Sequence, residues 1–146
     1  MGWWGTSIMD GDSPLDIEDA LYESMGVDKW PKDSEPGDKT PELPDETFEL
    51  THIVNFLSAN PWIKNGNGYD DLNIFYQVIG YHMLERGMKI DKYLQEKIIE
   101  ACDDDYWSKY DNERYQQIQG FKKYIEENKG EKVKLSSKGL LEKLFE

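Results

Sequence analysis

The stretch from Asp70 to Gly87 constrains the fold of this chain most, because its apolar residues are not confined to one stripe. At helical spacing they form two rows, with Leu72, Phe75, Ile79 and Met83 on one side and Ile74, Val78, Tyr81 and Leu84 on the other. A helix that is apolar nearly all round is usually surrounded by other elements. Asp70 or Asp71 is suited to its N-terminus, and Arg86 followed by Gly87 to its C-terminus. The sequence therefore predicts a central buried helix.

Other segments carry helix signals, and we predict a mainly α, compact bundle of five or six helices around the central one. The first helix begins at Ser13 as N-cap, with Pro14 at the first helical position, and ends at Gly26. The expected starts of the others are Asp45 or Thr47, Asp91, Asp111, and Ser136 or Ser137. In the second helix Phe48 or Leu50, Ile53, Val54 and Leu57 recur at helical spacing. Residues 131–135 alternate in polarity and predict at most one short β segment near the C-terminus.

With 146 residues and neither a repeat nor a boundary signal, the chain is predicted to form one domain, 1–146. Cys102 is the only cysteine, which excludes an intrachain disulfide and a cysteine zinc site. The opening residues lack the pattern of a signal peptide, and no apolar run is long enough to span a bilayer. We therefore expect a cytoplasmic protein without a membrane partner.

Residues 2–12 are predicted to form an irregular N-terminal arm, and residues 27–45, after the first helix, a long acidic loop. The loop contains Pro31, Pro36, Pro41 and Pro44, a density that prevents a helix and interrupts strand pairing. Loops of this length inside a compact domain are usually functional or flexible.

The net charge of −13 is unevenly distributed along the sequence. Of the 30 acidic residues 14 precede Thr51, against three of the 17 basic residues, so this third alone carries −11. Nucleic acid and anionic membranes are disfavoured as direct partners, because phosphate binding requires clustered Lys and Arg. Two interpretations are open: a surface that contacts a basic partner, and an acidic surface that keeps the protein soluble.

The candidate binding residues all lie in this acidic third. Its tryptophans are either core anchors or an exposed platform, and its carboxylates are available for cationic groups. The set is Trp3, Trp4, Asp10, Asp12, Trp30, Asp33, Glu35 and Asp38.

Motifs for catalysis are largely missing from the sequence. Asp10, Asp12 and Asp16 resemble the start of a calcium loop, but the glycine and glutamate that such a loop requires are replaced by leucines. These three carboxylates form the alternative hypothesis of a metal-assisted hydrolase. His82, three residues before Glu85, is expected to be a core or rim histidine, and Cys102 a poor nucleophile. We predict no cofactor.

Two patches of about 35 residues in total resemble a family of small bacterial and phage proteins of unknown function that open with Gly-x-Trp-Gly. The first patch is the opening Gly2-x-Trp4-Gly5, then an acidic turn and Leu15-Asp16; the second is Gln77-Val78-Ile79-Gly80-Tyr81 with Glu85 and Gly87. The proline-rich loop and the C-terminal part depart from the family pattern. The resemblance implies a bacterial or phage origin and a fold, but no activity.

The function expected from these observations is that of a small acidic non-enzymatic binding protein. Its acidic N-terminal third would contact a protein partner with a basic surface. The sharpest form of this hypothesis is a DNA-mimicking inhibitor of a host protein that handles nucleic acid or acts in defence.

Overall fold

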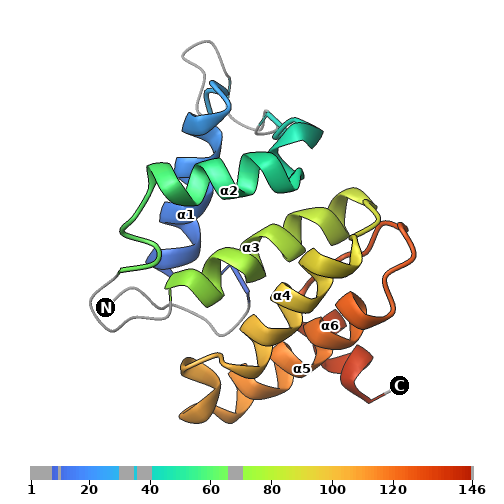
Figure 1. Cartoon of the computed structure of the whole chain (residues 1–146). Helices are drawn as coiled ribbons and strands as arrows, with labels where there is room; N and C mark the ends of the chain where they lie inside the picture. Colours follow the sequence, from blue (N-terminus) through green and yellow to red (C-terminus); the bar gives the residue numbers. More distant parts are fainter. Residues whose placement is uncertain (1–7, 10, 30–34, 36–40, 66–70, 146) are drawn as a thin grey trace.

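The computed structural model describes residues 8–9, 11–29, 35, 41–65 and 71–145, and within these it is mainly helical (Figure 1). The described part contains six α-helices, two short 3₁₀ helices and no strand, in agreement with the predicted fold class. In chain order the elements are α1 (Asp12–Ser24), η1 (Asp45–Phe48), α2 (Leu50–Ala59), α3 (Asp71–Arg86), α4 (Lys92–Asp103), η2 (Trp107–Lys109), α5 (Asn112–Glu126) and α6 (Ser137–Leu144).

Helix α3 is the central element that its sequence predicts. It packs against α1, α4 and α5, and residues all round it are buried, including Phe75, Val78 and Ile79. The Phe75 ring stacks on Phe56 of α2 with centroids 5.5 Å apart. Gly80 allows close approach, since a Cβ there would lie 3.1 Å from three apolar side chains of α4 and α5. The remaining helices are therefore organised around α3 (Figure 1).

Four of the predicted helix termini are confirmed. Asp91, Asp111 and Ser136 cap α4, α5 and α6, each accepting a hydrogen bond from a backbone N–H three residues later. Helix α3 ends at Arg86, and the φ of 74° at the following Gly87 lets the Met88 N–H donate to the Met83 carbonyl at 2.9 Å.

The predicted start of the first helix is wrong by two residues, since Ser13 was expected as its N-cap and Pro14 as its first helical residue. Helix α1 begins at Asp12 with Gly11 as its N-cap, and Ser13 makes no capping bond. Gly11 has a φ of 116°, a conformation that side-chain-bearing residues rarely adopt. This conformation at Gly11 directs the backbone into the helix at Asp12, before Ser13 is reached. Pro14 then occupies the third helical position, where its missing N–H has no intrahelical acceptor to lose.

Residues 131–135 form no strand, although their polarity alternates. Leu135 is buried while Lys132 and Lys134 are exposed, and the Val133 N–H donates to the Leu84 carbonyl at the end of α3. The alternation reflects one-sided burial of an irregular segment against a helix. The described parts of the predicted loop, 27–29, 35 and 41–44, contain no helix or strand, and the first residue of η1 is Asp45.

A buried polar network joins α3, α4 and α5. The Arg114 Nε and Nη2 atoms donate to the two Asp105 carboxylate oxygens at 3.1 and 3.0 Å, and both side chains are only 2% exposed. Gln77 of α3 accepts from Arg114 at 2.8 Å and donates to Asp105 at 2.9 Å. Burial by itself raises the pKa of Asp105, but the hydrogen bonds and charge of Arg114, with Ser108 and Gln77, outweigh it and hold that pKa below its ordinary value.

Replacing Asp105 with Asn should destabilise the fold by about 3–5 kcal/mol, because the Arg114 guanidinium is left buried without a counter-charge. Denaturant unfolding at pH 7 measures the loss. Asp103→Asn is the matched control, because its ion pair with Lys122 lies at the surface and contributes about 1 kcal/mol or less. Equal losses for the two variants would contradict a structural role for the buried pair.

Helix α6 docks on α5 through a backbone contact at Gly120. A Cβ at Gly120 would lie 1.9 Å from the Leu140 carbonyl oxygen, so any larger residue must displace α6. Leu140 itself is fully buried.

Gly120→Ala should therefore destabilise the protein by at least about 2 kcal/mol, although alanine favours a helix by about 1 kcal/mol over glycine. Gly80→Ala is the control, because its Cβ would meet only side-chain tips, which can shift. Thermal unfolding should show a clearly larger fall in Tm for Gly120→Ala. A reversed order would mean that α6 does not pack as described.

Candidate functional site

The outward side of α1 carries a row of carboxylates. Asp12, Asp16, Asp19 and Glu23 follow one another at spacings of four, three and four residues, and all four are exposed. This spacing places them on one face of a helix, opposite the fully buried Ile17 and Leu21. We call these four residues the acidic face.

The electrostatics of the acidic face show that its charges repel one another. Burial raises the pKa of Asp16, and the neighbouring carboxylates Asp12, Asp19 and Asp71 raise it further. Lys29 pairs with Asp19 at 2.9 Å and with Glu18. Among the described residues, Asp12, Asp16 and Glu23 make no ion pair, so the face presents net negative charge to a partner.

A buried carboxylate fixes α1 to the central helix. Glu18 lies 2.7 Å from the His82 Nε2 atom of α3 and also contacts Lys29, and its side chain is only 13% exposed. Burial by itself raises the pKa of Glu18, but hydrogen bonds from His82 and Lys29 bring it below its ordinary value. The histidine is thus a rim residue with a partner, as expected. In the sequence, the only indication of this contact is that Glu18 directly follows the apolar Ile17.

Glu18→Gln should cost about 1–3 kcal/mol at pH 7, because the carboxylate shared by Lys29 and His82 is replaced by a neutral amide with a single acceptor oxygen. Since the folded pKa of Glu18 is below the unfolded value, its stabilisation is present above about pH 4.5 and is lost as the pH falls through the folded value. The free energies of unfolding of wild type and variant should therefore converge in acid. The exposed Asp12→Asn is the control, and a constant gap down to pH 3 would contradict this assignment.

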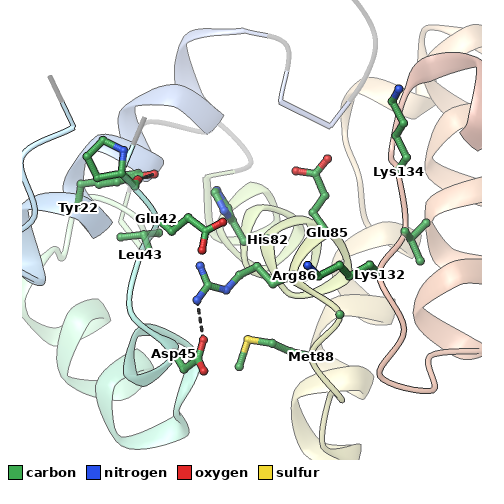
Figure 2. A pocket seen from close by; sticks show the side chains of 13 residues that line it. Tyr22, Glu42, Leu43, Asp45, His82, Glu85, Arg86, Met88, Lys132 and Lys134 are labelled. Atoms are coloured by element: carbon green, nitrogen blue, oxygen red, sulfur yellow. Dashed lines mark hydrogen bonds and ion pairs between the residues drawn. The ribbon is translucent and has the colours of Figure 1, made fainter. Parts of the chain in front are cut away.

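A surface pocket of about 910 Å³ lies beside this contact, between the N-terminal third and the end of α3 (Figure 2). Figure 2 shows the Arg86 guanidinium pointing towards Asp45, with which it forms an ion pair, and Glu42 on the same side. The wall is formed by Tyr22, Pro41, Glu42, Leu43, Asp45, His82, Glu85, Arg86, Gly87, Met88, Lys132, Val133 and Lys134.

The pocket is lined by acidic and basic residues, and the guanidinium of Arg86 is already held in its ion pair with Asp45. Arg86 also lies over the Phe48 ring at 5.2 Å, and its Nε atom is buried without a hydrogen-bond partner. Burial raises the pKa of Glu85 on the same wall. Since acidic and basic residues both line it, the pocket selects neither an anion nor a cation by charge, and the acidic face is the better candidate for recognition.

The structure locates two of the predicted binding residues. Asp12 lies on the acidic face, and Glu35 is exposed. The remaining six lie outside the described residues: Trp3, Trp4, Asp10, Trp30, Asp33 and Asp38.

For the metal hypothesis, Asp12 and Asp16 are one turn apart on α1, and Asp10 lies outside the described residues. Within the described part, no three His, Cys, Asp or Glu side chains are grouped to hold a metal ion. Burial, followed by the charge of Asp105, raises the pKa of the Cys102 thiol, in line with its expected poor nucleophilicity.

Comparisons with protein-family models, curated proteins and solved structures found no match. The resemblance to the Gly-x-Trp-Gly family therefore stays a prediction. None of the helices in the described part is both long and apolar enough to cross a membrane.

Proposed function

We propose that this chain is a small non-enzymatic binding protein whose acidic N-terminal third contacts a basic surface on a protein partner. The observation that carries the proposal is the acidic face of α1, in a part of the sequence that holds −11 of the net charge. A surface of one sign raises the encounter rate with an oppositely charged partner and disfavours anionic ones.

The geometry of the acidic face suits a partner that normally binds a charged polymer. From Asp12 to Glu23 the helix rises about 16 Å, so its carboxylates follow one another at about 5.5 Å. Phosphates along one DNA strand are about 3.4 Å apart along the axis. The face is a less dense row of negative charge than DNA, but it repeats that charge at a regular spacing along one line. This repetition is what supports the more specific proposal of a DNA-mimicking inhibitor of a host protein that handles nucleic acid or acts in defence.

The anchoring of α1 to the core also favours binding, because it makes the acidic face a rigid surface. The helix is held by the buried side chains Ile17 and Leu21 and by the contact of Glu18 with His82. Charges fixed on a packed helix lose little conformational freedom when they bind, which improves affinity for a matching partner.

Reversing the acidic face should remove partner binding, mainly by slowing association. The test variant is Asp12→Lys, Asp16→Lys and Glu23→Lys, and the matched control reverses three exposed acids elsewhere, Glu96, Glu100 and Glu113, with the same change in net charge. A partner captured from a bacterial lysate by wild type is immobilised, and association and dissociation rates are measured at low and high salt. We expect the α1 variant to associate at least about tenfold more slowly at low salt, with little change in dissociation.

Three outcomes would contradict the proposal. They are an association rate that does not depend on salt, equal loss in the control variant, and failure to capture any protein that salt releases. Calorimetric titration of the chain with Mg²⁺ or Mn²⁺ tests the metal-assisted hydrolase instead.

A further inference from the structure

Helix α2 and the turn after it form a charge-free stretch in a highly charged chain. Residues 50–63 contain no Asp, Glu, Lys or Arg, although 32% of all residues are charged. The sequence has only one other charge-free stretch of similar length, residues 72–84, and that one is the buried centre of α3. Charge-free sequence is thus expected in the core of this protein, but in α2 it also reaches the surface.

One side of α2 packs on the core and the other is exposed. Ile53, Phe56 and Leu57 are buried, whereas the opposite side carries large apolar residues in contact with solvent. Leu50 is 43% exposed, Val54 55% and Trp62 41%. We call the exposed residues of this side the uncharged face: Leu50, Thr51, Val54, Asn55, Ser58, Ala59 and Trp62.

This face shares its lack of charge and its exposed Leu50, Val54 and Trp62 with an interface core. Charged residues are depleted there and aromatic and aliphatic side chains are present, whereas the rest of the surface of such a chain is dominated by charge. Of the apolar residues that recur at helical spacing in this segment, Ile53 and Leu57 are buried, whereas Val54 lies on the exposed side.

The ends of the uncharged face differ in charge. Glu46 and Glu49 are exposed before its first residue, and Lys64 is exposed after its last. If two copies pair these helices antiparallel about a two-fold axis through Val54, the acidic end of each copy meets the basic end of the other. The two Val54 side chains then meet at the centre, next to the small residue Ser58 one turn further on, which permits close approach of the backbones.

We infer that the uncharged face of α2 binds a second copy of this chain in an antiparallel two-fold pair. A second copy fits because the face is complementary to itself, in its apolar centre, in its oppositely charged ends and in its antiparallel helix dipoles. Two molecules of net charge −13 repel each other through most of their surfaces, and this face is where they approach without facing like charges. One helix and its flanking turns bury less than the roughly 800 Å² per partner of a stable interface, so the pair is weak, with a dissociation constant on the order of 100 µM.

This inference does not rest on the proposed function, and the two contacts are expected to respond to salt in opposite directions. Binding of the acidic face to a basic partner weakens as salt rises. Self-association strengthens, because salt screens the repulsion between two acidic molecules while the apolar centre is little affected.

Sedimentation equilibrium of the full chain tests the inference, from about 10 to about 500 µM protein and from about 0.05 to about 0.5 M NaCl. The weight-average mass should rise from the 17.1 kDa of a monomer towards twice that value with concentration, and further with salt. A monomer under all conditions overturns the inference. Association that weakens with salt also overturns it, because it would indicate a contact made by charges.

Variants locate the contact. Val54→Lys places two like charges together at the two-fold axis and should weaken self-association at least about tenfold. Tyr93→Lys is the matched control, because Tyr93 is 52% exposed on α4, and its self-association should equal that of wild type. Equal effects of the two variants, or none from Val54→Lys, overturn the assignment to α2.

A charge swap tests the antiparallel arrangement. Glu46→Lys and Lys64→Glu should each weaken self-association several-fold, and the double variant should restore it, because the exchanged charges again face each other across the pair. A double variant weaker than both single ones overturns the antiparallel arrangement. Far-UV circular dichroism checks that each variant remains folded.

Discussion

The arrangement of the core depends on the ion pair between Arg114 and Asp105 more than on any other polar interaction. Both groups are removed from water, which is costly unless every polar atom finds a partner. Here Gln77, Ser108 and the Trp107 ring surround the pair, with the guanidinium carbon 4.7 Å from the ring centroid. Since an apolar core could supply comparable stability, the network contributes chiefly by allowing one relative placement of α3, α4 and α5.

The N-terminal third and α2 are attached to this scaffold through α3 by a different set of contacts. Phe56 stacks on Phe75, Glu18 binds His82, and Asp45 binds Arg86. In both polar contacts the acid comes from the N-terminal third and the basic group from α3. A few carboxylates of the acidic third are thus used for attachment, while Asp12, Asp16 and Glu23 stay on the surface with their charge intact.

The features predictable from sequence are those determined within a few residues. The buried α3 and the caps Asp91, Asp111 and Ser136 follow from patterns in which each signal and its partner are close in the chain. Long-range contacts carry no such signal. The partner of Arg114 is Asp105, nine residues away, and no local pattern links the two. The close contact of Gly120 with Leu140 is equally unpredictable, because a glycine in a helix gives no indication of what packs on it.

The candidate site is likewise predictable from the sequence only in its local features. The excess of acidic residues in the first third and the positions of Asp12 and Asp16 are visible in the sequence. Their arrangement in one row depends on where α1 begins. A first helical residue at Asp12, instead of the predicted Pro14, brings Asp12 into the helix and extends the exposed row by one carboxylate. The exposure of Val54 could not be predicted, because an apolar residue next to Ile53 satisfies the helical pattern for either orientation of α2.

The acidic face and the uncharged face lie on helices that are in contact, since the Ser24 hydroxyl of α1 is 3.2 Å from the His52 Nε2 atom of α2. A two-fold pair formed through α2 would therefore carry two acidic faces with a fixed relative orientation. Two linked faces bind a partner that has two basic surfaces, or a row of them, more tightly than one face can, because the second contact forms at a high effective concentration. A weak pair would gain stability from such a partner, since binding both copies adds the free energy of the partner contacts to that of the α2 contact. Basic partners with repeated or symmetric surfaces would then be favoured over those with a single basic patch. The charge that keeps two copies apart in solution is the same charge that a basic partner neutralises when it brings them together.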